Sequence, residues 1–156
     1  MSMILGSDYI DADNSFTTTL KTKGSKVFVR AFAGSGVSAN TPALVTEMGS
    51  GYNATVLITA LYGRVGVPEG TQAVGAGSWG WFQIRGPVEG VQASIGEASG
   101  EAGHAVVWTG ATLYGSSSAN QGRASIGQVG VFTGSRAADE STTINIYLTG
   151  VWATAV

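Results

Sequence analysis

Glycine constrains the fold of this chain more than any other feature. The 156 residues include 24 glycines, spread from Gly6 to Gly150, and each one weakens a helix by up to ~1 kcal/mol relative to alanine. The β-branched and aromatic residues gather in short runs between these glycines, and the runs alternate with the two-residue period of a strand. The sequence therefore predicts an all-β protein.

We expect about nine strands, because short alternating runs separated by Gly- and Ser-rich turns are typical of a sandwich or barrel. The clearest candidates cover residues 16–20, 27–32, 55–62, 79–85, 88–95, 105–108, 124–132 and 142–152. Residues 21–26, between the first two, are expected to form a hairpin. The predicted body is one β-barrel or jelly-roll-like sandwich over residues 15–156.

Residues 1–14 differ from the body. Asp8, Asp11 and Asp13 lie there among few apolar residues. A terminal segment without a core of its own is either an arm ordered by contact with a partner or a frayed end. We expect an extended N-terminal arm, and we expect no signal peptide because the first residues lack a basic region.

Ionised residues are scarce in this sequence. They make up 12% of the chain, with a net charge of -2 and 44% hydrophobic residues, whereas a typical domain has about 25% charged residues. Low charge favours a surface covered by partner proteins, and a neutral monomer coated with Ser and Thr is the alternative. The acidic balance argues against nucleic acid, and the lack of a long apolar run argues against a membrane span.

Few residues are suited to catalysis. The chain has one histidine, His104, and no cysteine. No Gly-x-Ser-x-Gly elbow accompanies His104, and one histidine without cysteine makes a soft-metal site unexpected. The carboxylates lie in the arm and in expected loops rather than paired across a cleft. We therefore expect no enzymatic activity, metal or cofactor; a small hydrolase that uses His104 is a minor alternative.

A basic cluster is the first candidate binding feature. Lys21, Lys23, Lys26 and Arg30 lie close together in the sequence, and strand alternation places several of these side chains on one face. Such a face suits an acidic protein surface or phosphates. A solvated hairpin tip is the alternative interpretation.

An aromatic run is the second candidate feature. Alternation places Trp79 and Trp81 on one face of a strand and Phe82 on the other, and Arg85 ends the same run. Large aromatics serve both as core residues and as interface anchors. Exposed tryptophans, these or Trp108 and Trp152, also stack on sugar rings, so a carbohydrate-binding module of the tail-spike or lectin kind is the alternative function.

One segment points to a family. Residues 80–88, Gly-Trp-Phe-Gln-Ile-Arg-Gly-Pro-Val, resemble a segment of the small decoration, or cement, proteins of tailed-phage capsids. The similarity extends loosely over residues 61–156, through Tyr-Gly-Arg-Val-Gly at 62–66, Ala-Ser-Ile-Gly-Gln-Val-Gly at 124–130 and Thr-Ile-Asn-Ile-Tyr-Leu at 143–148. The first 60 or so residues are not covered by it.

The resemblance implies a β-barrel or jelly-roll protein, often a homotrimer, without catalytic residues. Such a protein binds the major capsid protein on the outer capsid surface, at threefold or quasi-threefold positions, and stabilises the shell. It is made in the host bacterial cytoplasm and ends in the virion. On this hypothesis Asp8, Asp11, Asp13, Lys21, Lys23 and Lys26 contact the capsid, while Trp79, Trp81, Phe82 and Arg85 support the body core or the subunit interface.

Overall fold

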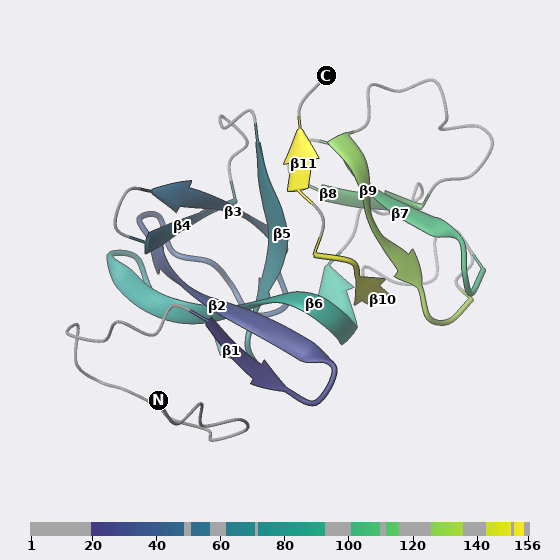
Figure 1. Ribbon diagram of the computed structural model, residues 1–156, viewed down its shortest axis with the longest axis horizontal. Coiled ribbons are helices and arrows are strands. Elements are labelled where there is room, and N and C mark those ends of the chain that lie inside the picture. The colour runs from purple at the N-terminus through teal and green to yellow at the C-terminus, as the bar shows by residue number, and fades with distance from the viewer. Residues whose placement is uncertain are drawn as a thin grey trace, which may run out of the picture.

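The computed structural model describes residues 20–48, 51–56, 62–70, 72–92, 101–109, 112–115, 126–135, 143–150 and 152–154. These residues form eleven strands and no helix (Figure 1). The strands are β1 (Leu20–Lys23), β2 (Lys26–Ala33), β3 (Ala43–Met48), β4 (Gly51–Thr55), β5 (Tyr62–Pro68), β6 (Ser78–Gln92), β7 (Ala105–Thr109), β8 (Thr112–Gly115), β9 (Ile126–Phe132), β10 (Thr143–Leu148) and β11 (Trp152–Thr154). The predicted all-β class is confirmed. The expected arm, with Asp8, Asp11 and Asp13, lies outside the described residues.

Five strands close into a barrel, on the left of Figure 1. Their hydrogen-bonded order is β2-β4-β3-β5-β6, and β6 pairs back to β2 to complete the ring. Only the β2–β4 pair of this ring is parallel. Strand β1 extends the barrel as the hairpin partner of β2, and β11 pairs with β5. Closure removes the open edges that a flat sheet of these strands would expose.

The hairpin between β1 and β2 confirms the prediction for residues 21–26, with a tighter loop than expected. Only Gly24 and Ser25 separate the two strands. Gly24 has a φ of +59°, which suits the first central position of a type II′ turn, the kind that matches the twist of a two-stranded ribbon. The turn therefore fixes the register of the hairpin.

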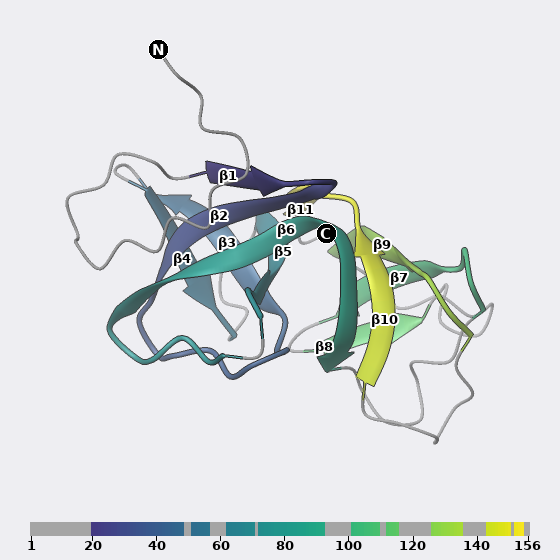
Figure 2. The same ribbon diagram turned by 90° about the horizontal axis from the view of Figure 1, so that it is seen from below.

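A second sheet, called here the distal sheet, continues from the barrel. Its order is β6-β10-β9-β7-β8, and every pairing in it is antiparallel. Figure 2 shows β6 leaving the barrel and turning to run beside β10. The sequence predicted two strands, 79–85 and 88–95, and this was wrong: one 15-residue strand serves both sheets. The chain bends at Gly86 and Pro87 without losing its pairing.

The bend in β6 has two structural causes. Gly86 has a φ of +96°, and a Cβ atom there would lie 2.8 Å from the carbonyl oxygen of Ser25, so only glycine fits. The buried Gln83 side chain donates through Nε2 to the carbonyl oxygens of Arg85, at 3.1 Å, and Pro87, at 2.9 Å. These bonds cross the bend and hold its two sides together.

Two further strand predictions were wrong in their boundaries. The strand expected over residues 55–62 is not continuous, because β4 ends at Thr55 and Val56 lies in a bend; residues 57–61 lie outside the described residues. The strand expected over residues 142–152 is interrupted after Leu148, and Gly150, with a φ of +73°, separates β10 from β11. Glycine again allows the backbone conformation that ends the strand.

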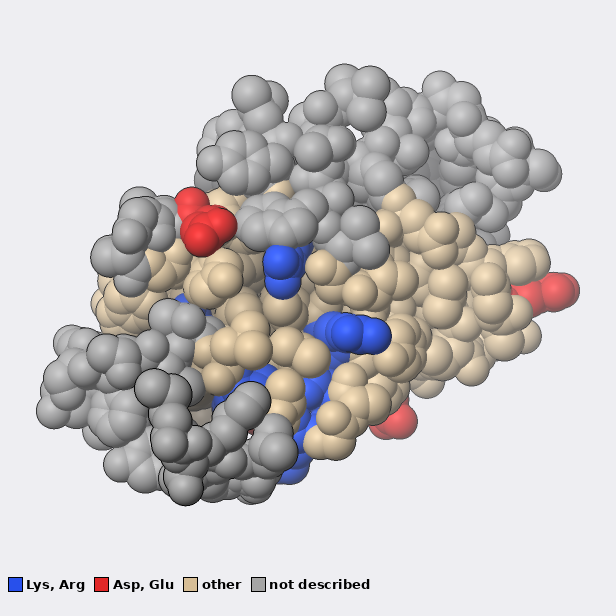
Figure 3. Space-filling view, viewed as in Figure 1, with Lys and Arg blue, Asp and Glu red and all other residues tan. Residues whose placement is uncertain are grey.

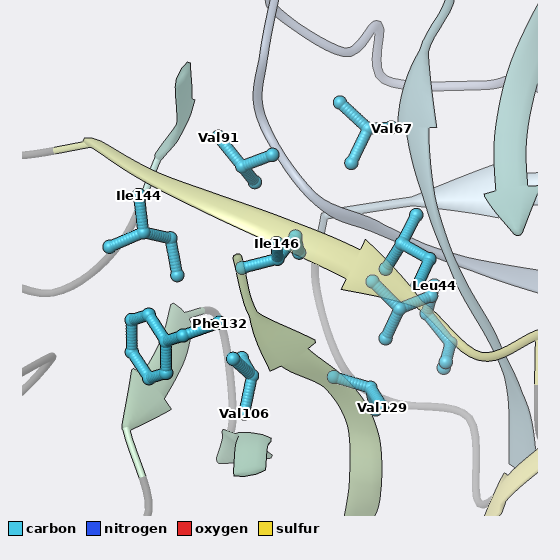
Figure 4. Packing of buried hydrophobic residues seen from close by; sticks show 10 residues of the cluster. Leu44, Val67, Val91, Val106, Val129, Phe132, Ile144 and Ile146 are labelled. Atoms are coloured by element: carbon cyan, nitrogen blue, oxygen red, sulfur yellow. The ribbon is translucent and has the colours of Figure 1, made fainter. Parts of the chain in front are cut away.

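The apolar side chains form two adjoining clusters. The barrel core fills the ring and comprises Val29, Ala31, Ala33, Val37, Ala43, Val45, Ala54, Phe82 and Ile84. The shared core joins barrel and distal sheet and comprises Leu44, Val65, Val67, Val91, Val106, Val129, Phe132, Ile144, Ile146 and Leu148. Figure 4 shows Leu44 and Val67, from barrel strands, on one side of this cluster and Phe132 on the other. The shared core therefore packs the two sheets against each other.

Candidate binding surface on the barrel

The register of β1, β2 and β6 creates one continuous outer face. Directly opposed residues point to the same side of an antiparallel sheet. The pairs that form this face, named here the outer barrel face, are Lys21 with Phe28, Lys23 with Lys26, Arg30 with Trp81 and Phe32 with Trp79. The structure therefore brings the predicted basic cluster and the predicted tryptophans together on one surface, which sequence analysis treated as two separate features.

Phe82 and Arg85 complete the predicted aromatic run. Phe82 is fully buried in the barrel core, so the expected separation of Trp79 and Trp81 from Phe82 is confirmed. Arg85 is exposed where β6 approaches the bend. Phe82 thus belongs to the body of the protein, whereas the two tryptophans belong to its surface.

The hairpin end of the outer barrel face is strongly basic. Lys23 and Lys26 are paired across the strands beside the turn. Residues 20–85 contain six of the eight Lys and Arg residues and two of the ten Asp and Glu residues, a formal charge of +4 in a chain of net charge -2. Figure 3 shows most of the blue side chains in the lower middle of the view, where Figure 1 places the β1–β2 hairpin, while the red ones lie nearer the outline of the molecule. The barrel part of the sequence is therefore basic, and Lys23 and Lys26 contribute two of its positive charges at the hairpin end.

Lys21 lies in a cluster of charged and aromatic side chains. Its ammonium forms an ion pair with Glu69, which follows β5. The same Nζ lies 4.5 Å from the ring centroid of Trp81 and 5.1 Å from that of Phe28. The Lys21 side chain is only 17% exposed. Lys21, one of the predicted capsid-binding lysines, is therefore fixed by contacts within the barrel. The sequence pattern did not indicate that Glu69 takes part in this cluster.

The opposite end of the outer barrel face is aromatic. Trp79 is 42% exposed, although large aromatics are usually covered. Its ring lies 5.7 Å from the ring of Phe32, tilted by 59°, and the Arg30 guanidinium lies 5.7 Å from its centroid. A Cβ atom on Gly51 would be 3.5 Å from the indole. The indole is therefore supported by β2 and β4 while much of it faces solvent.

A hollow of about 320 Å³ lies beside this indole. Its lining includes Glu69, Gln72, Val74, Ser78, Trp79 and Trp81, from β6 and the segment that precedes it. The volume is at the lower end of the range for small-molecule sites.

Backbone hydrogen bonds fix the segment that walls this hollow. Val37 and Val74 exchange two bonds of 2.8 Å, and the Glu69 amide donates to the Trp81 carbonyl at 2.8 Å. Val74 also fills the space above Gly80, where a Cβ atom would lie 2.3 Å from a Val74 methyl group. The hollow is therefore a preformed part of the fold.

The remaining candidates for chemistry lie elsewhere. His104 is exposed at the start of the distal sheet, where its Nδ1 accepts a hydrogen bond of 3.3 Å from the Glu101 amide. Across the described ranges, no three His, Asp or Glu side chains come together as a metal site would require. Nor does the described part of the chain hold a helix long and apolar enough to span a bilayer.

Comparison of the chain with protein-family models, with curated proteins and with solved structures finds no match. The resemblance to capsid decoration proteins therefore depends on the sequence segments given above. Most of its best segment, residues 80–88, lies in the barrel half and the bend of β6.

Proposed function

We propose that this protein is a phage capsid decoration protein that binds the assembled shell through the hairpin end of its outer barrel face. The proposal includes a homotrimer at threefold or quasi-threefold positions, with the major capsid protein as the partner. Residues 1–14 supply a further contact in this proposal. The observation that carries it is the concentration of positive charge on one rigid hairpin of an otherwise acidic chain.

The apposition of Lys23 and Lys26 supports a charged partner. Two ammonium groups paired across the strands at the end of a hairpin complement an acidic patch on a partner. Such complementarity speeds and orients the encounter. The acidic partner that fits is the outer surface of the shell.

The mechanism of stabilisation is thermodynamic linkage. A protein that binds only the assembled shell stabilises that state by mass action. In a trimer each subunit would contact a different capsid subunit. The trimer would therefore bind the shell more tightly than a single subunit does. No catalytic group is needed for this function.

The direct test is mass spectrometry of purified virions, followed by binding to shells stripped of this chain. We expect many copies in each particle, a trimer by analytical sedimentation, and a higher melting temperature of shells that carry the protein. Its absence from virions, or a monomer that leaves shell melting unchanged, would overturn the proposal.

A matched pair of variants tests the surface itself. Lys23→Gln with Lys26→Gln lowers the charge by two at the hairpin end. The control, Gln128→Glu with Thr133→Glu, makes the same change at an exposed position in β9 and at one directly after it. We expect at least roughly tenfold weaker shell binding for the first pair only, with a strong dependence on salt. Equal effects of the two pairs would show that net charge, not the hairpin, governs binding.

A further inference from the structure

We infer that the hollow beside Trp79 is a carbohydrate-binding site that takes a single sugar ring of a glycan. The site is separate from the shell-binding surface proposed above. Lys26 marks the hairpin end of the outer barrel face, and Phe32, the partner of Trp79, marks the aromatic end. The two residues are six positions apart on β2, so the two ends lie roughly 20 Å apart. A protein attached through its hairpin therefore keeps this hollow available to a second ligand.

The first reason is the presentation of Trp79. The face of an aromatic ring is electron-rich and attracts weakly positive C–H groups such as those on one side of a sugar ring. The indole is 42% exposed, yet it is held in place by Phe32 and by its close approach to Gly51. A platform that is fixed before the ligand arrives loses little entropy on binding.

The second reason is the polar lining. Gln72 offers an amide oxygen and two N–H donors, Ser78 a hydroxyl group, and Glu69 carboxylate oxygens. Sugar hydroxyls both donate and accept hydrogen bonds, so this set matches them better than it matches an apolar ligand. An aromatic wall with a few fixed polar groups is the usual composition of a small-ligand site.

The third reason is charge, which separates sugars from the other ligand that aromatic walls attract. Aromatic sites with a nearby carboxylate also bind quaternary ammonium groups. Here the nearby carboxylate is already paired, because Lys21 lies over Trp81 and forms an ion pair with Glu69, and the Arg30 guanidinium lies near Trp79. A further cation would be repelled, whereas a neutral or acidic sugar would not.

The lining also fits binding rather than hydrolysis. Glycoside hydrolysis ordinarily needs two carboxyl groups on either side of the scissile bond. Glu69 is the only acidic residue among the described residues that line the hollow, and it is engaged by Lys21. The site is therefore expected to hold a glycan without cleaving it.

The test is binding to an array of neutral and acidic glycans, followed by titration with maltotriose, chitotriose and a glucuronic-acid disaccharide. Tryptophan fluorescence and saturation-transfer NMR report the binding. We expect at least one array glycan to bind and to be released by its free sugar. The absence of binding across the array and the three titrations would overturn the inference.

Variants assign the binding to this hollow. Trp79→Ala and Gln72→Ala should each weaken it by roughly fivefold or more, while Trp79→Phe retains part of it. The control is Leu20→Ala, which removes another exposed apolar side chain outside the hollow. Glycan binding that survives both alanine substitutions in the hollow would also overturn the inference, and far-UV circular dichroism verifies that each variant is folded.

The two proposals fail separately. Lys23→Gln with Lys26→Gln should leave glycan binding intact, and Gln72→Ala should leave shell binding intact. A protein that binds glycans but never appears in virions loses the decoration role alone. One that binds shells but no glycan loses the sugar site alone.

Discussion

The barrel and the distal sheet share strand β6, but the two parts of the sequence that hold them differ in charge. Residues 20–85, which hold the barrel half of β6, have a formal charge of +4, whereas residues 86–156 contain two basic and five acidic residues. Both regions bury well-packed apolar clusters. Among the described residues, apolar packing therefore extends through both regions, whereas the basic and exposed aromatic side chains discussed above lie on the barrel.

The shared core packs the barrel and the distal sheet together into one body. Leu44, Val65 and Val67 come from barrel strands, yet they pack with Ile144, Ile146 and Leu148 of β10. On β10 these residues alternate with more exposed ones, which is the pattern of a strand covered on one face. Loss of this cluster should therefore affect both regions at once.

The largest effect is expected for Ile146→Ala. Ile146 is fully buried in the shared core, and deletion of such a side chain leaves a cavity that lowers the free energy of unfolding by about 3 kcal/mol. Hydrogen exchange should lose protection equally in barrel and distal strands, because one cluster couples them. Protection lost in the distal strands alone would show that the barrel folds independently, and the comparison of two coupled regions would fail.

An intermediate effect is expected for Gly86→Ala, which strains the point where the two regions meet. The positive φ and the close Ser25 carbonyl leave no place for a Cβ atom, so we expect a loss of roughly 2–3 kcal/mol in urea denaturation. Gly90→Ala on the same strand is the control: its φ is +65° but its surroundings are open. It should lose about 1 kcal/mol. Equal losses would mean that backbone conformation alone, not the close packing of the junction, requires glycine at position 86.

The bend lies in the segment on which the proposed relation to decoration proteins rests, residues 80–88. Trp81 faces outward, whereas Phe82 and Ile84 pack in the barrel core. Gln83 donates hydrogen bonds across the bend, and Gly86 adopts the positive φ that the bend requires. Each of these five positions has a structural reason. These five residues therefore serve mainly to build the body, whereas the proposed binding surfaces depend mostly on residues outside the segment.

Sequence patterns predicted the parts of the fold that depend on local alternation. The hairpin and the opposite orientations of Trp81 and Phe82 follow from a two-residue period, and both are confirmed. The continuity of β6 through Gly86 could not be predicted, because Gly-Pro ordinarily marks a strand end. Strands β3, β4, β8 and nearly all of β5 were missed. In β3 and β4, Glu47, Gly51 and Asn53 obscure the alternation.

The candidate site was only partly predictable for a related reason. The lysines and tryptophans were identified as separate groups, since their proximity depends on the pairing of β2 with β6. Glu69 and Gln72 lie in a segment without periodicity, and only the folded chain brings them beside Trp79. Long-range register is the information that a single sequence lacks.

The smallest effect is expected for the Lys21–Glu69 pair, and it separates lysines that stabilise the barrel from lysines that serve its surface. Lys21→Met removes an ion pair and contacts with two rings, so we expect a loss of about 1 kcal/mol. A double-mutant cycle with Glu69→Gln should show coupling of roughly 0.5 kcal/mol that shrinks in high salt. Lys26→Met, the matched control, removes one of two facing charges and should change stability by less than about 0.5 kcal/mol. Equal losses of stability for both lysine variants in urea denaturation would show that Lys26 stabilises the fold as Lys21 does. That result would contradict a binding role for the hairpin end.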